Sequence, residues 1–215
     1  GFIAVLGKPN VGKSTLMNYV LGQKVAAVSP RPQTTRRNQL GILTTPQAQL
    51  IFVDTPGLHH PHTRLGEAMN TSALAAMADA DVLLCIADAS QPPDDADRRL
   101  ALAVTERAAS TPAFLALNKL DLLAGDMRAT RQAQFLEVFP EAKPFFISAQ
   151  AGFGVKELME VVTECLPPGE PFYPQNQVTD LYEREIAADL VREAALNCLR
   201  EEVPHSMAVR VDEYK

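Results

Sequence analysis

The chain has 215 residues, of which 47% are hydrophobic, and its formal net charge is −6 at pH 7. This composition predicts a globular protein with one domain of ordinary size and a small addition, and it excludes a disordered chain. Three cysteines without a C-x-x-C pair exclude a disulfide scaffold, and no apolar run reaches membrane-spanning length. The negative charge argues against a broad nucleic-acid-binding surface.

The first segment, FIAVL at 2–6, is a short apolar run that predicts a buried strand. The stretch GKPNVGKS at 7–14 follows it and matches G-x-x-x-x-G-K-[ST], the loop that binds nucleoside phosphates. Its glycines let backbone N–H groups turn around an anion, and the helix predicted after it, ending at Gly22, adds a favourable field. We expect Lys13 to reach the outer phosphates and the Ser14 hydroxyl to bind Mg²⁺. The expected phosphate-binding residues are Gly7, Asn10, Val11, Gly12, Lys13, Ser14 and Thr15.

Apolar runs and helix-like segments alternate through the middle of the chain. The apolar runs are 50–53, 82–87, 113–117 and 144–147. The helix-like segments are 64–78, 94–108, 128–138 and 155–165. The alternation predicts an α/β fold of the P-loop NTPase type, a mostly parallel six-stranded sheet with helices on both faces. We expect the segments 39–45 and 48–54 to pair as a hairpin, which makes one strand an antiparallel edge. We expect Cys85 to be a core residue rather than a nucleophile.

The stretch FVDTPG at 52–57 ends the second of these apolar runs. Asp54 lies at the strand end, and we expect it to hold Mg²⁺ through a bridging water. The Gly57 N–H is available to a γ-phosphate. Because D-T-P-G is also good turn chemistry, a plain β-turn stays the alternative.

The stretch FLALNKLD at 114–121 indicates the base. The Asp121 carboxylate can accept hydrogen bonds from N1–H and the 2-amino group of guanine, whereas adenine would leave a carboxylate unpaired. We expect Asn118 to tie this loop to its neighbours and the Lys119 stem to cover the purine face. A second loop, ISAQ at 147–150, supplies Ser148, Ala149 and Gln150, with the Ala149 N–H facing guanine O6.

The stretch LPPGEPFYPQ at 166–175 cannot continue a helix or a central strand and marks a boundary. We therefore divide the chain into a nucleotide-binding domain at 1–168, a linker at 169–178 and the start of a second, truncated domain at 179–215. In that second part Asp180 and Glu183 resemble a capping box that opens a helix to about residue 202. We expect its apolar side to carry Ile186, Leu190 and Val191, and a strand to follow over 207–211.

The segments GKPNVGKS, QTTRR, DTPGL, NKLD and SAQ occur in this order, and together they resemble the signature of translation-factor-like GTPases. Within that class, SPRPQTTRRNQLGI and the tail TDLYEREIAADLVREAALNCLREEVPHSMAVRV resemble the Era family. The resemblance covers essentially the whole chain. It implies a Ras-like G domain that hydrolyses GTP with Mg²⁺, followed by the start of an α+β KH domain. It also implies a role in small ribosomal subunit assembly, through 16S rRNA binding by the complete protein.

The same resemblance assigns roles in the segments that would sense the γ-phosphate. It makes Thr35 the threonine that completes Mg²⁺ coordination, with Thr34 as the neighbouring candidate. It also links Leu58, which stands where many GTPases have a water-orienting glutamine, to activation by K⁺ held at Asn10. The expected catalytic set is therefore Lys13, Thr35, Gly57 and Asn10, and the expected metal ligands are Ser14, Thr35 and Asp54. Weaker candidates are an arginine finger among Arg31, Arg36 and Arg37, and catalysis by His59, His60 or His62.

Other functions stay open from the sequence. A P-loop kinase, a nucleotide-gated binding module with negligible hydrolysis, and a GTPase of the MnmE or Der type share parts of the pattern. Residues 170–215 carry 5 Lys and Arg against 10 Asp and Glu, and no G-x-x-G loop, so we expect this chain to bind RNA weakly. We expect a cytoplasmic protein without a transmembrane segment, with peripheral contact at the inner face of the cell membrane as an open alternative.

Overall fold

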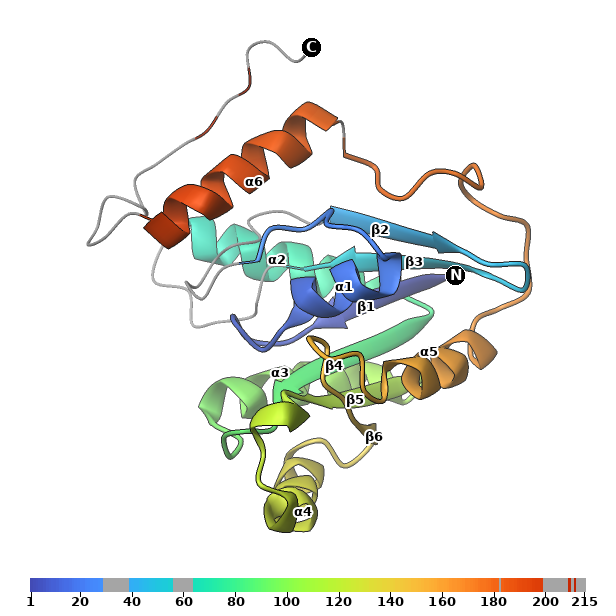
Figure 1. Cartoon of the computed structure of the whole chain (residues 1–215). Coiled ribbons are helices and arrows are strands. Elements are labelled where there is room, and N and C mark those ends of the chain that lie inside the picture. Colours follow the sequence, from blue (N-terminus) through green and yellow to red (C-terminus); the bar gives the residue numbers. More distant parts are fainter. Residues whose placement is uncertain (29–38, 56–63, 182, 199–208, 210, 212–215) are drawn as a thin grey trace.

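The computed structural model describes residues 1–28, 39–55, 64–181, 183–198, 209 and 211 (Figure 1). The strands are β1 (Phe2–Leu6), β2 (Gln39–Thr44), β3 (Gln49–Asp54), β4 (Val82–Asp88), β5 (Ala113–Asn118) and β6 (Lys143–Phe146). The helices are α1 (Lys13–Leu21), α2 (Arg64–Ala78), α3 (Asp95–Ala108), α4 (Arg128–Val138), α5 (Val155–Glu164) and α6 (Glu183–Cys198). Two short 3₁₀ turns, Leu120–Leu122 and Gly125–Met127, follow β5.

The strands form one six-stranded sheet in the order β2-β3-β1-β4-β5-β6. The pairs from β3 to β6 are parallel, and only the edge pair β2–β3 is antiparallel. The predicted mostly parallel sheet with an antiparallel edge hairpin is therefore confirmed. Parallel strands end at the same edge of a sheet, so β1, β3, β4 and β5 all end there.

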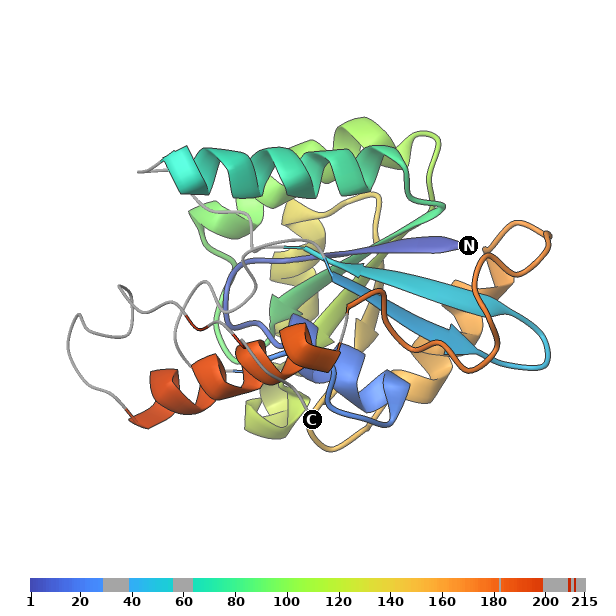
Figure 2. The same cartoon turned by 90° about the horizontal axis from the view of Figure 1, so that it is seen from above.

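Helices cover both faces of the sheet, as predicted. Leu16 of α1 and Leu158 of α5 belong to one buried cluster, whereas Leu100 of α3 and Phe135 of α4 belong to the cluster on the opposite face. Figure 2 shows α2 on one side of the sheet and α1 and α5 on the other. Cys85 lies in the second cluster with no exposed surface, and burial raises the pKa of its thiol to about 12, so it is a core residue.

After α5 the chain turns back along the open edge of the sheet before it enters α6 (Figure 1). The Gln49 side chain accepts the backbone N–H groups of Phe172 and Tyr173, at 2.8 and 3.0 Å. Farther on, Ile42 of β2 donates its N–H to the Val178 carbonyl at 2.7 Å. The predicted linker thus adds hydrogen bonds to the edge of the sheet.

Two expectations about the last helix are wrong. It begins at Glu183, and the Asp180 carboxylate instead accepts the backbone N–H of Leu40 in β2 at 3.0 Å. Val191, expected on the buried side, is 55% exposed, while Glu193 is 8% exposed. The reason is a polar docking contact: the Glu193 carboxylate accepts from Lys24 Nζ at 2.7 Å and from the Val28 N–H at 3.1 Å.

The other expectations for the second domain stay predictions. The expected helix end near residue 202 and most of the strand at 207–211 lie outside the described residues. In the part of the chain that the structure describes, no helix is both long and apolar enough to span a membrane.

Candidate functional site

The loop between β1 and α1 has the backbone of an anion cradle. Gly7 and Gly12 have φ angles of 152° and 104°, and Asn10 adopts a left-handed φ of 64°. A Cβ at Gly7 would lie 2.5 Å from the Ile86 carbonyl oxygen, and a Cβ at Gly12 would collide with the Asn118 amide. Both glycines are therefore required by space as well as by φ. The helix α1 starts directly after Gly12 without a side-chain cap, which leaves its N-terminus to an anion.

Lys13 lies at the centre of this cradle. Its ammonium donates to the carbonyl oxygens of Gly7 and Lys8, each at 3.0 Å, and the residue is 7% exposed. Burial lowers the pKa of Lys13 to about 8, against an opposing effect of the Asp54 carboxylate. A phosphate placed against this ammonium would supply the negative charge that the buried site favours.

Ser14 and Asp54 come together, as the sequence predicts for two ligands of one metal ion. The Ser14 hydroxyl donates to Asp54 Oδ2 at 3.1 Å, across the gap between α1 and the end of β3. Asp54 has no exposed surface. Next to it, Thr55 donates its hydroxyl to the Val5 carbonyl at 2.8 Å and so joins the end of β3 to β1.

Asn118 connects three loops through one amide group. Its Nδ2 donates to the Val11 carbonyl in the phosphate-binding loop at 2.7 Å. Its Oδ1 accepts the backbone N–H of Ala149 at 2.9 Å. The sequence predicted a tie between loops at this residue, and the structure places it between these two partners.

The same region orients Asp121. The Ser148 hydroxyl donates to Asp121 Oδ1 at 2.5 Å, which fixes the carboxylate beside the loop that carries Ala149. Two other residues were expected to bind the nucleotide. Thr15 is half-buried in α1, and Gln150 is exposed.

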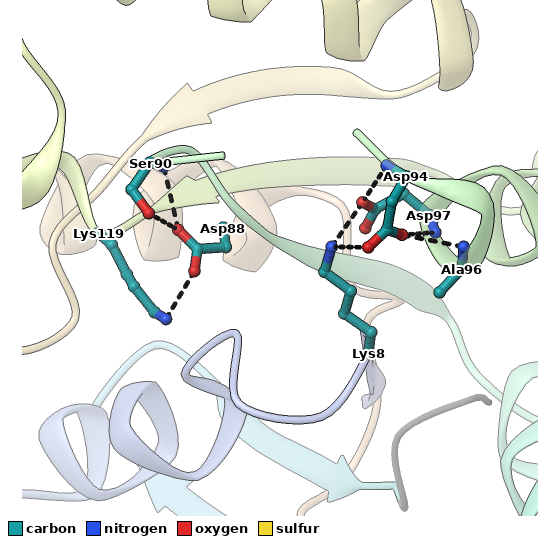
Figure 3. Close-up of polar contacts among 7 residues, drawn as sticks. All are labelled: Lys8, Asp88, Ser90, Asp94, Ala96, Asp97 and Lys119. Atoms are coloured by element: carbon teal, nitrogen blue, oxygen red, sulfur yellow. Dashed lines mark hydrogen bonds and ion pairs between the residues drawn. The ribbon is translucent and has the colours of Figure 1, made fainter. Parts of the chain in front are cut away.

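Lys119 makes a contact that the sequence did not reveal. Its backbone has a left-handed φ of 63°, and its ammonium pairs with Asp88 Oδ2 at the end of β4, at 2.6 Å (Figure 3). Ser90 donates both its N–H and its hydroxyl to the other oxygen of Asp88, at 3.0 and 2.6 Å. Burial alone would raise the pKa of Asp88, but the hydrogen bonds from Lys119 and Ser90 outweigh it and lower the pKa below its ordinary value.

A second lysine, Lys8, also reaches the segment between β4 and α3 (Figure 3). Its ammonium lies 2.8 Å from Asp94 Oδ2 and 2.9 Å from Asp97 Oδ2. Asp94 and Asp97 also form the capping box of α3. Nothing in the phosphate-loop pattern assigns a role to Lys8, which occupies one of its variable positions.

Several predicted site residues lie outside the described residues, and their roles stay predictions. They are Arg31, Thr34, Thr35, Arg36, Arg37, Gly57, Leu58, His59, His60 and His62.

Comparison with known proteins places this site in a family. A family model described as 50S ribosome-binding GTPase matches residues 2–119. GTPase Era of Carboxydothermus hydrogenoformans is 44% identical over 215 residues, which is all of this chain and 72% of that protein. The chain belongs to the Era family of GTPases. GTPase Era of Geobacter metallireducens is 40% identical over the same span, again with 72% of that protein covered.

Solved Era structures agree with this assignment over nearly the whole chain. A crystal structure of Era in complex with MgGDPNP and nucleotides 1506–1542 of 16S ribosomal RNA has a TM-score of 0.92 and 38% identity. It matches 99% of this chain and 72% of its own length. An Aquifex aeolicus Era variant bound to GDP·AlF4⁻ has a TM-score of 0.89 and 37% identity, with the same coverage. The match therefore includes α6, beyond the six-stranded domain.

Proposed function

We propose that this chain is a GTP-hydrolysing switch whose complete form acts in small ribosomal subunit assembly through 16S rRNA. The proposal of guanine-nucleotide binding rests on the two hydrogen bonds of the Asn118 amide. They join the phosphate loop at Val11 to the expected base-binding loop at Ala149. We infer 16S rRNA as the RNA partner from the Era structure with 16S RNA, and not from the family description, which mentions the 50S subunit. That Era structure matches 99% of the chain, whereas the family model matches residues 2–119.

Guanine selection follows from the carboxylate of Asp121. Ser148 fixes one of its oxygens at 2.5 Å, and this orients the group toward donors of the base. Guanine offers two such donors side by side, and a site built on such bonds rejects a base that lacks them by roughly 10⁴–10⁵.

Mg²⁺ fits the oxygen atoms that the structure brings together. The Ser14 hydroxyl and the Asp54 carboxylate lie 3.1 Å apart, and hydroxyl and carboxylate oxygens are ligands that Mg²⁺ prefers. We infer that Ser14 and Asp54 hold the ion, with Thr35 as a further predicted ligand. When bound, Mg²⁺ supplies positive charge to the β- and γ-phosphate oxygens.

The chain's own residues account for binding and charge stabilisation. Lys13, held by the Gly7 and Lys8 carbonyls, keeps its ammonium inside the cradle where the outer phosphates would lie. Charge that develops during phosphoryl transfer would be stabilised there without reorganisation. We further propose that Asn10 holds K⁺ and that Gly57 binds the γ-phosphate.

We also propose that the chain divides into a G domain at 1–168, a linker at 169–178 and the start of a KH domain at 179–215. We propose a cytoplasmic location for the protein, with peripheral contact at the inner face of the cell membrane as an alternative.

The test is release of phosphate from GTP by the 215-residue chain in Mg²⁺, with ATP as the control. We expect turnover on the order of 10⁻⁴–10⁻² per second, no hydrolysis of ATP and loss of nucleotide binding in Lys13→Ala. Replacing K⁺ with Na⁺ at the same ionic strength should slow hydrolysis in the wild type and not in Asn10→Ala. Absence of GTP hydrolysis in both salts, with intact GTP binding, would favour a nucleotide-gated binding module.

A further inference from the structure

Lys8 is a cation of the phosphate-binding loop whose ammonium pairs with two carboxylates at the start of α3. It lies 2.8 Å from Asp94 Oδ2 and 2.9 Å from Asp97 Oδ2, and its side chain is 18% exposed (Figure 3). Burial alone would lower the pKa of Lys8, but the hydrogen bonds to Asp94 and Asp97 outweigh it and raise the pKa above its ordinary value. The charge of Lys8 is therefore committed to the start of α3.

The acidic partners of Lys8 are themselves fixed. Asp94 Oδ1 accepts the N–H groups of Ala96 and Asp97, and Asp97 Oδ2 accepts the N–H of Asp94 at 3.0 Å. The side chain of Asp97 is 1% exposed. A carboxylate this deeply buried needs a counter-charge, and Lys8 supplies it from 89 residues away in the sequence.

The backbone of Lys8 connects this bridge to the phosphate-binding lysine. The Lys8 carbonyl oxygen accepts a hydrogen bond from Lys13 Nζ at 3.0 Å. Lys13 is 7% exposed, so its ammonium depends on the carbonyls of Gly7 and Lys8 for its position. Movement of the Lys8 peptide would therefore move one of the acceptors that aim Lys13.

We propose that Lys8, Asp94 and Asp97 are positioning residues for nucleotide binding. Their bridge fixes the Lys8 peptide, and that peptide holds Lys13 toward the outer phosphates. The inference deepens the proposed function and rests on it, because the phosphates in question are those of a guanine nucleotide. The bridge acts through Lys13 and touches no phosphate itself.

The experiment compares Lys8→Met, Asp97→Asn and the double variant by GDP titration and by thermal unfolding. Lys8→Met should weaken GDP binding roughly tenfold to a hundredfold, because the Lys8 peptide loses its anchor. It should also lower the unfolding temperature, because it leaves the Asp97 carboxylate buried without a cation. The double variant removes that buried charge, so it should regain unfolding temperature relative to Lys8→Met while GDP binding stays weak.

Two further measurements separate positioning from a general effect on stability. GMP lacks the β-phosphate, so competition with GMP should show a smaller loss of affinity in Lys8→Met than titration with GDP does. Lys8→Arg should restore GDP binding to near the wild-type value, since a guanidinium can also bridge two carboxylates. Lys156→Met, which breaks an exposed pair with Glu160 on α5, is the matched control and should change neither quantity.

Three results would overturn the positioning role while wild-type GDP binding is intact. These are GDP binding by Lys8→Met within about twofold of wild type, equal losses for GDP and GMP, or recovery of GDP binding together with stability in the double variant. Failure of the wild type to bind GDP would instead refute the proposed function, so the two failures are distinguishable.

Discussion

At the scale of single residues, the proposed role of Asp121 in base selection can be tested directly by replacing this residue. In Asp121→Asn the side-chain amide can donate to the 2-carbonyl of xanthine, and its oxygen can accept from N1–H. We expect GDP affinity to fall by at least roughly a hundredfold and xanthosine diphosphate to become the preferred ligand.

Calorimetric titration of both nucleotides checks this exchange. Ser148→Ala should weaken GDP binding less than Asp121→Asn does, because it removes only the hydrogen bond that orients the carboxylate. Unchanged GDP affinity in Asp121→Asn would show that this carboxylate does not read the base.

Asp88 gives a prediction about pH. Its pKa is lowered in the folded chain, so its pairing with Lys119 and Ser90 contributes stability that is present above the ordinary carboxyl pKa of about 4. This contribution is lost as the pH falls through the lowered folded value. Asp88→Asn should therefore reduce the free energy of unfolding by about 1 kcal/mol at neutral pH, with little difference from wild type in strong acid.

Urea unfolding at several pH values measures this difference. Asp126→Asn, at an exposed position of the turn Gly125–Met127, serves as the control for the loss of an exposed carboxylate. A gap between wild type and Asp88→Asn that stays constant into acid would exclude the Lys119 pairing as its source.

At the scale of elements, the phosphate loop and β5 touch where Gly12 meets Asn118. Gly12→Ala places a Cβ against the Asn118 amide and requires an alanine at φ 104°. We expect the bond from Asn118 to Val11 to break and GDP affinity to fall roughly a hundredfold or more. Gly125→Ala, where a Cβ would meet nothing within 4 Å, should bind GDP as wild type does. If Gly12→Ala and Gly125→Ala bind GDP with the same affinity, the Gly12–Asn118 contact does not contribute to nucleotide binding.

Local pattern predicted most elements of the fold. The helix over 128–138 is found as α4 (Arg128–Val138), and the apolar run at 82–87 lies within β4 (Val82–Asp88). Periodicity and strand-end loops depend on neighbours in sequence, so they can be read without coordinates. The predicted tie at Asn118 follows from the same logic, because strand ends of a parallel sheet share one edge.

The sequence predictions missed contacts that depend on distant partners. Glu193 is buried because Lys24 and the Val28 N–H lie against it, although its helix has apolar residues such as Val191 that local pattern would bury first. Lys8 and Asp97 are likewise 89 residues apart. Such pairs are determined by the packing of whole elements, and neither residue carries a local signal for its partner.

The docking of α6 gives a prediction at the same scale. In Glu193→Gln the ion pair with Lys24 is lost and the bond to the Val28 N–H is weakened. The Val28 amide should then exchange its hydrogen about tenfold faster, which corresponds to roughly 1.4 kcal/mol of local opening. Glu160→Gln on the exposed face of α5 is the control. Unchanged exchange at Val28 would mean that Glu193 does not hold this segment.

At the scale of the whole molecule, the uneven charge bears on RNA. Residues 170–215 carry a net charge of −5, from 5 Lys and Arg against 10 Asp and Glu, and contain no glycine for a G-x-x-G loop. We expect the 215-residue chain to bind single-stranded 16S rRNA weakly, and a longer Era-family protein with a complete KH domain to bind it tightly. A salt titration of both proteins tests this. Tight binding by the short chain with a steep salt slope would place an RNA site in the G domain, with Arg31, Arg36 and Arg37 to mutate first.

The strand β2 forms the outer edge of the sheet, and residues 178–180 hydrogen-bond to Leu40 and Ile42 along it. An uncovered edge strand is a template on which a strand of another molecule can add, and this is a common route to aggregation. The returning segment therefore covers backbone groups with which a strand of another molecule could pair, as well as joining two parts of the chain. Cleavage by a protease in the proline-rich stretch 166–175 would untether this cover and leave β2 open to pairing between copies.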